Sequence, residues 1–192
     1  MGICVQKADG TLGTVDYYKK LEYGWTDAMK LAQTLKGKAR VVVDLYADWT
    51  AVEGQFTDNF DNDTGFDWDA IHIPQNVRVT FNLNGHKIDR ALTTDESNGE
   101  VICIDKNADV IINGGTFNAL KCILDIQNNL GDGDHNPAVI INGGEFSADP
   151  TISASYGNNL IKLKDGYTIK TENGKFVLAK AVASVNGVYY AT

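Results

Sequence analysis

One phrase occurs twice in this sequence, and a looser version of it occurs once before. Val110–Phe117 reads VIINGGTF, Val139–Phe146 reads VIINGGEF, and Phe81–Ile88 reads FNLNGHKI. The asparagines of these phrases, Asn84, Asn113 and Asn142, are 29 residues apart both times (113 − 84 and 142 − 113). A constant period between about 20 and 50 residues is typical of repeat architectures. The chain is therefore expected to stack similar units on one another.

Each repeat also carries a second short apolar run, and these runs are too short for helices and rich in β-branched residues. They are Ile71–Ile73, Val101–Ile104, Ile123–Ile126 and Leu160–Leu163, and Val41–Leu45 precedes them as a first strand. Short strands at regular spacing with polar turns between them predict an all-β fold, a parallel β-helix of about four to five rungs. The spacing of 31 from Asn142 to Asn173 (173 − 142) predicts a last rung with a hairpin cap.

The Asn-Gly pairs are expected to form the corners of the coil, because Asn and Gly adopt a left-handed backbone most readily. These structural corners are Asn84 with Gly85, Asn113 with Gly114, and Asn142 with Gly143. Stacked asparagines are also expected to hydrogen-bond in a ladder. The alternative is three ordinary hairpin turns, which does not explain the constant period.

One amphipathic helix is predicted at residues 26–36, with Thr26 as N-cap, Asp27 in the first turn and Gly37 at its end. It is expected to cover the exposed end of the stack, and a partner-binding helix is the alternative. The predicted domains are an N-terminal segment at 1–24 for attachment or oligomer contact, the β-helix at 25–180, and a C-terminal strand or cap at 181–192.

The charge of the chain excludes several partners. The formal net charge is −8 and the pI is about 4.8, so neither nucleic acid nor an anionic membrane is an expected partner. No apolar stretch is long enough to span a membrane, and the N-terminus lacks the pattern of a signal peptide. The chain is therefore expected to stay in a cytoplasm or to leave it inside a virus. The three cysteines, Cys4, Cys103 and Cys122, are expected to be reduced core residues.

The sequence contains none of the common catalytic motifs, so no catalytic residue is assigned and the chain is not expected to be an enzyme. His72, His86 and His135 lie in separate repeats or loops without metal-ligand spacing, and each is expected at the surface or a corner. Asp105 and Asp125 are expected to be ordinary surface carboxylates of a solenoid. No cofactor is expected, apart from calcium as an option.

The calcium option comes from an acidic, aromatic-rich loop after the first strand. Asn59, Asp61 and Asp63 offer alternating oxygen ligands, and Asp67 and Asp69 could complete the set. The glycine of a calcium loop, Gly65, falls one place late, however, and no glutamate follows. A solvated acidic loop is the alternative. Trp49 and Trp68 are candidates for stacking on a glycan, or else fill a small core of the loop.

Three segments, Gly65–Pro74, Val79–Arg90 and Gly99–Asp105, resemble right-handed β-helix modules of the pectate-lyase-like superfamily, as found in phage and bacterial surface proteins. The resemblance covers about residues 25 to 148. Members include tailspikes, appendages, adhesins and polysaccharide enzymes, so the fold implies no single function.

The function favoured by this resemblance is a non-enzymatic structural or adhesion protein of a phage virion, of the fibre, spike or capsid-decorating type. Its expected partners are itself, as a homotrimer, other virion proteins, and a host-surface polysaccharide contacted by loops 53–69 and 128–136. The alternatives are a carbohydrate-binding or polysaccharide-cleaving β-helix and a fragment of a bacterial surface protein, located outside the cell or at its surface.

Overall fold

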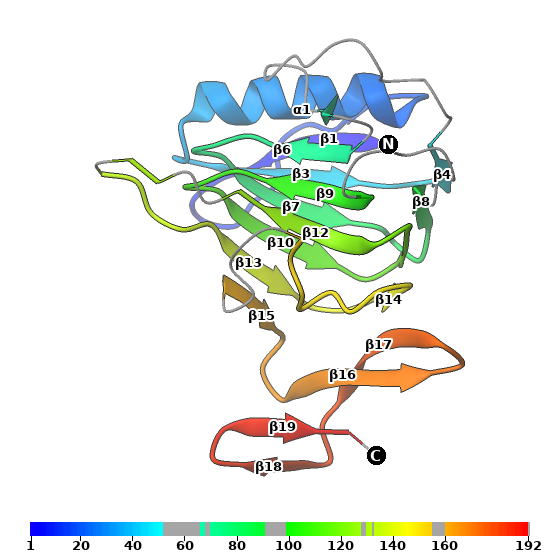
Figure 1. Cartoon of the computed structure of the whole chain (residues 1–192). Coiled ribbons are helices and arrows are strands. Elements are labelled where there is room, and N and C mark those ends of the chain that lie inside the picture. Colours follow the sequence, from blue (N-terminus) through cyan, green and yellow to red (C-terminus); the bar gives the residue numbers. More distant parts are fainter. Residues whose placement is uncertain are drawn as a thin grey trace.

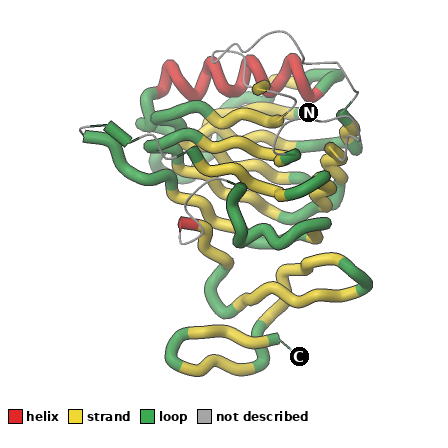
Figure 2. Tube along the Cα trace, in the orientation of Figure 1, coloured by secondary structure: helices red, strands yellow, loops and turns green. Residues whose placement is uncertain are grey.

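The computed structural model describes residues 1–51, 66–67, 70–90, 99–127, 130–131, 133–154 and 160–191. Within these ranges the protein is mostly β-strand with one helix, so the all-β prediction is confirmed at this level. Figures 1 and 2 show the strands stacked in layers below the helix, with two hairpins at the C-terminal end.

Three sheets are built from strands that recur along the chain. In the first sheet five strands pair in parallel: β3 (Arg40–Asp44), β7 (Arg78–Asn82), β10 (Asp109–Asn113), β13 (Ala138–Ile141) and β15 (Ile161–Leu163). In the second sheet four strands do so: β4 (Trp49–Thr50), β8 (Lys87–Arg90), β11 (Thr116–Ala119) and β14 (Glu145–Phe146).

The third sheet is smaller. Its parallel strands are β6 (Ala70–Ile73), β9 (Glu100–Ile104) and β12 (Cys122–Ile126), and β5 (Phe66–Asp67) pairs antiparallel with β6. Ser153 extends this sheet by one bridge to Leu124. Each successive segment of the chain thus adds a strand to the first, second and third sheet in turn.

The apolar side chains of the three sheets meet in one core. Along β10 buried and half-buried positions alternate, as expected when one face of a strand packs inward. In-register residues of successive strands stack: Phe117 of β11 pairs with Phe146 of β14, and their rings are stacked with centroids 5.5 Å apart. Such aromatic pairs add about 0.5–1.5 kcal/mol beyond the area that they bury.

The 29-residue period describes β8, β11 and β14 of the second sheet, whereas in the first sheet it holds from β10 to β13 and fails from β7 to β10. Lys87 pairs with Thr116 and Thr116 with Glu145, both 29 residues apart, whereas Asn113 pairs with Asn82, and Asn84 has no place in this row. The physical reason is the corner length: four residues separate β7 from β8, and two separate β10 from β11.

The asparagine ladder exists with a different first member from the one predicted. Asn142 Nδ2 donates to Asn113 Oδ1 (2.9 Å), Asn113 Nδ2 donates to Asn82 Oδ1 (2.7 Å), and Asn82 Nδ2 donates to Asp44 Oδ1 (2.8 Å). Asn84 instead donates to the carbonyl of Leu45. Each amide donates in one direction, and a carboxylate, which only accepts, ends the row.

The corners also differ from each other in backbone conformation. Asn84 and Gly85 are both left-handed (φ 53° and 82°), as predicted. Asn113, Asn142 and Gly143 are not; the left-handed residues there are Gly114, Gly115 and Gly144. The shorter corners place the asparagine at the end of a strand, so the turn itself falls on glycine.

The helix α1 (Leu21–Leu35) begins five residues earlier than predicted, and Thr26 is not its N-cap. Lys20 stands there without a side-chain cap, because buried contacts rather than a cap determine the start: Leu21 and Trp25 lie in the core beside Ala28 and Met29. At the other end Lys36 is already left-handed (φ 48°), one residue before Gly37.

The N-terminal segment belongs to the body of the protein. β1 (Gly2–Gln6) pairs antiparallel with all of β3 and with β2 (Asp16–Tyr17), and Ile3 and Cys4 are buried. The expected boundary at residue 24 falls inside α1. Figure 1 shows α1 lying across the end of the stack beside β1 and β3.

The C-terminal end leaves the parallel pattern. β16 (Tyr167–Glu172) and β17 (Lys175–Lys180) form a hairpin around Asn173 and Gly174, and β17 pairs antiparallel with β14. The predicted rung at Asn173 is therefore a hairpin turn, with left-handed Asn and Gly (φ 51° and 77°). β18 (Ala183–Val185) and β19 (Val188–Tyr190) form a second hairpin.

Candidate functional site

The outer face of the third sheet carries buried polar side chains. All five residues of β9 are buried, although a strand with one solvent-exposed face alternates. His72 of β6 pairs in register with Cys103 of β9, and Cys103 with Asp125 of β12. These three side chains therefore form a row across the sheet, and their residues are 3%, 5% and 1% exposed.

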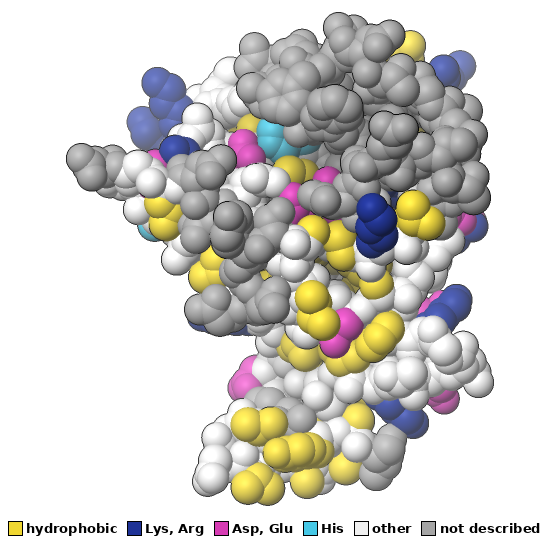
Figure 3. Space-filling view, viewed as in Figure 1, with side chains coloured by type: hydrophobic (Ala, Val, Ile, Leu, Met, Phe, Trp, Pro, Cys, Tyr) yellow, Lys and Arg dark blue, Asp and Glu magenta, His cyan; other side chains and the backbone are white. Residues whose placement is uncertain are grey.

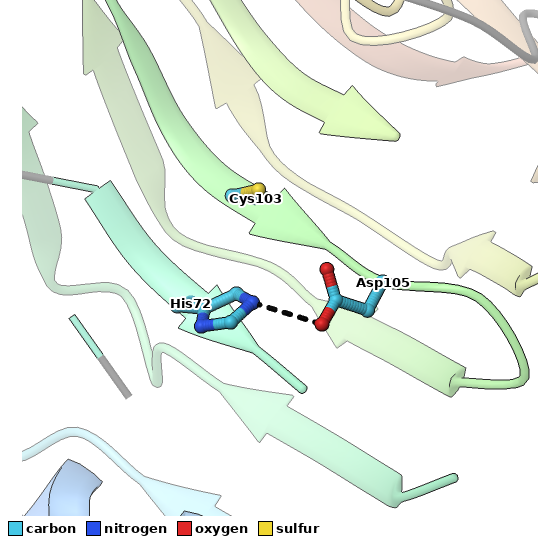
Figure 4. Close-up of side chains that lie close together, drawn as sticks. All are labelled: His72, Cys103 and Asp105. Atoms are coloured by element: carbon cyan, nitrogen blue, oxygen red, sulfur yellow. Dashed lines mark ion pairs between the residues drawn. The ribbon is translucent and has the colours of Figure 1, made fainter. Parts of the chain in front are cut away.

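Asp105 joins this row at the end of β9. It lies two residues after Cys103, so both side chains project from the same face of the sheet, and His72 Nε2 lies 3.2 Å from Asp105 Oδ2. Figure 4 shows the imidazole and the carboxylate facing each other, with the Cys103 thiol on the neighbouring strand. One ligand atom from each of His72, Cys103 and Asp105 lies within 4.8 Å of the other two.

The strand that carries His72 is fixed from the inner side. Trp25 of α1 is fully buried, and its indole Nε1 donates a hydrogen bond to the His72 carbonyl (3.0 Å). The same ring packs against Phe81 with centroids 5.0 Å apart. The helix thus fixes the backbone of β6 at His72, the residue that carries the imidazole.

The neighbouring part of the row is acidic. Asp125 Oδ2 accepts a hydrogen bond from Gln127 (2.5 Å), and its Oδ1 is buried with no hydrogen-bond partner among the described residues. The pKa of the nearby Cys122 thiol is raised to about 11, chiefly by burial and also by the negative charges of Glu100 and Asp125, against the opposing effect of Arg90 and Lys121. Cys122 is therefore protonated at neutral pH.

The structure corrects two expectations here, for His72 and for Asp125. His72 is neither at the surface nor at a corner, and Asp125 is not a surface carboxylate; Asp105 remains partly exposed. Cys103 is a buried thiol, as expected, and it lies on the outer face of the sheet beside polar groups. The sequence did not show that these residues lie together, because each of the paired residues His72, Cys103 and Asp125 belongs to a different repeat. The signal was present: Ile-His-Ile at 71–73, Ile-Cys-Ile at 102–104 and Leu-Asp-Ile at 124–126 align with their middle residues outward.

Of the calcium and glycan candidates, the structure describes the side chain of Trp49 alone. Asp61, Asp63 and Trp68 lie outside the described residues, and for Asp67 only the backbone, in β5, is described. Trp49 is 8% exposed and belongs to the core, with its strand paired to β8 at Ile88. Its ring is therefore not available to stack on a sugar.

The other two histidines lie apart from the row. His86 Nδ1 lies 3.3 Å from Asp48 Oδ1 at a corner, and His135 is exposed. Where it is described, the loop at 128–136 is tied to the turn before β10: Asp134 accepts hydrogen bonds from Lys106 (2.6 Å), Gly131 N (2.7 Å) and Asn107 (2.8 Å). The Lys106 hydrogen bond is the main reason why the pKa of Asp134 falls to about 2.

Comparison with known proteins gives no relative: no family model, no curated protein and no solved structure matches this chain. In the parts of the chain that are described, no helix is both long and apolar enough to span a membrane.

Proposed function

We propose that this chain is a short right-handed parallel β-helix of the pectate-lyase-like kind, with α1 as its cap. Three sheets with parallel, in-register strands from successive repeats support this architecture. The handedness follows from the general preference of parallel crossovers. The proposed role is that of a non-enzymatic structural or adhesion protein of a phage virion, which assembles as a homotrimer and presents its loops to neighbouring subunits or a host glycan.

The observation that carries this proposal is the apolar surface of the last hairpin. Val182, Val185, Val188 and Tyr190 are 50–65% exposed, and Figure 3 shows apolar side chains gathered on β18 and β19. The hairpin forms a two-stranded sheet of its own, and isolated two-stranded hairpins are marginal in water. A second copy of the chain that covers this surface would stabilise it, since exposed apolar clusters mark interaction sites.

We predict a trimer in solution, held by this hairpin. Light scattering on the purified chain should give about three times 20.9 kDa. Replacing Val185 and Val188 together by aspartate places charges in the contact, and the mass should fall to that of one chain. Ile152→Asp is the matched control, because Ile152 is similarly exposed (51%) but lies outside the hairpin and should leave the trimer intact.

A wild-type monomer at micromolar concentration would contradict the proposed assembly. A trimer that survives the double substitution would place its contact away from the hairpin. The partly exposed Asp105 carboxylate, 3.2 Å from the His72 imidazole, favours the second candidate function, a carbohydrate-binding or polysaccharide-cleaving β-helix. A monomer that releases reducing sugar from a polysaccharide would support that candidate instead.

A further inference from the structure

We propose that His72, Cys103 and Asp105 form a binding site for a divalent transition metal of the Zn²⁺ class. The proposal rests on the geometry of the third sheet and is independent of the assembly proposed above. Such a site would explain why polar side chains are buried on this sheet, which a purely structural role does not.

The three donors suit such an ion in type. An imidazole nitrogen, a thiolate sulfur and a carboxylate oxygen are the ligands that Zn²⁺ takes in proteins. Calcium and magnesium prefer oxygen alone, so the thiol selects against them. Three protein ligands leave one position of a tetrahedral ion for water or another ligand, as in open zinc sites.

The donors also suit the ion in spacing. Nitrogen and oxygen ligands about 2.0–2.2 Å from a tetrahedral Zn²⁺ lie about 3.3–3.5 Å from each other. His72 Nε2 and Asp105 Oδ2 are 3.2 Å apart, and all three donor atoms lie within 4.8 Å of one another. Small side-chain rotations therefore bring the set onto one ion, while the strands stay in place.

The surroundings favour a cation. His72 Nδ1 is buried and has no hydrogen-bond partner among the described residues, so coordination through it would break no hydrogen bond, and coordination through Nε2 would replace only the contact with Asp105. Buried polar atoms without a partner are rare and call for an explanation. Asp125, the register neighbour of Cys103, adds a buried carboxylate oxygen, Oδ1, for which the described part of the chain offers no hydrogen-bond partner. On binding, the Cys103 thiol would release its proton to solvent and coordinate as thiolate.

The test is a Co²⁺ titration of the full chain, reduced and freed of metal with a chelator. One equivalent of Co²⁺ per chain should produce a thiolate-to-metal charge-transfer absorption in the near ultraviolet, and Zn²⁺ should remove it. Cys103→Ser should abolish this band. Cys122→Ser is the matched control, since Cys122 lies on the next strand outside the donor set and should keep it.

Asp105→Asn provides a second variant whose fold should be unaffected, because Asp105 is partly exposed and the side-chain shape is retained. We expect Co²⁺ to bind it at least about tenfold more weakly, since even the loss of an outer-shell partner costs tenfold or more. Circular dichroism of the metal-free variants checks that each one is folded. A wild-type chain without the band, or a band that persists in Cys103→Ser, would overturn the proposal.

Discussion

Gly115→Ala is expected to lower the free energy of unfolding by about 3–5 kcal/mol, whereas Gly114→Ala should cost only about 1–2 kcal/mol. Both glycines are left-handed, with φ of 84° and 66°. A left-handed backbone is unfavourable for alanine by about 1–2 kcal/mol at either position. The difference between the neighbours comes from what their added methyl groups would meet.

At Gly115 a methyl group would lie 2.2 Å from Leu83 Cβ and 2.8 Å from the His86 carbonyl oxygen, both in the corner of the preceding repeat. Leu83 is fully buried and cannot turn away without opening a cavity. At Gly114 an added methyl group would have no atom of the described residues within 4 Å, its chain neighbours aside. Urea unfolding of both variants measures the two costs, and equal values would show that the corners are not in this close contact.

Arg40→Met is expected to cost about 2–4 kcal/mol, and Arg78→Met less than about 1 kcal/mol. Arg40 joins three strands from its place in β3. Its guanidinium donates to the Val79 carbonyl of β7 (2.8 Å), and it contacts the carbonyl (3.1 Å) and the carboxylate (2.6 Å) of Asp109 in β10. The Arg40 side chain is only 9% exposed and its bond to the Val79 carbonyl is buried, so that carbonyl would lose its partner without regaining water.

Arg78 is the control because it contacts the same carboxylate (3.0 Å) from a side chain that is 45% exposed. Exposed pairs of this kind contribute little. Equal losses of unfolding free energy in the two variants would show that the buried contacts of Arg40 with β7 and β10 add no stability beyond an exposed ion pair.

The same cluster predicts a pH dependence. Burial alone would raise the pKa of Asp109, but the hydrogen bonds and charges of Arg40 and Arg78 outweigh it, and the net pKa is lowered. The ionised carboxylate therefore stabilises the fold above the unfolded-chain value of about 4, and this contribution is lost as the pH falls through the lower folded-state pKa. Arg40→Met should lose less stability than the wild type in this acid range. A parallel loss in both proteins would contradict the assignment.

Much of the strand arrangement could be predicted from local pattern. The runs at 71–73, 101–104 and 123–126 and all of 41–45 except Leu45 lie in strands, because short runs rich in β-branched residues between turn residues favour this element. The corner register could not be predicted to the residue. The spacing of 29 residues fits the pair of Thr116 and Glu145. Whether a corner contains two or four residues depends instead on how Leu83 packs against Gly115.

The helix start and the polar row were missed for a related reason. A cap-based prediction placed the start at Thr26, whereas burial of Leu21 and Trp25 extends α1 toward the N-terminus. The row of His72, Cys103 and Asp125 arises only once register across three repeats is known. Motif spacing within one repeat could not reveal it.

Contacts between valine methyl groups test the parallel stacking of the repeats most directly. Val41, Val79, Val110 and Val139 are buried and occupy the same register position of β3, β7, β10 and β13, on neighbouring strands about 4.8 Å apart. Nuclear Overhauser spectra of methyl-labelled protein should therefore connect Val41 to Val79, Val79 to Val110, and Val110 to Val139. A folded, well-dispersed spectrum without these three connections would contradict the stacked architecture on which the proposed function rests.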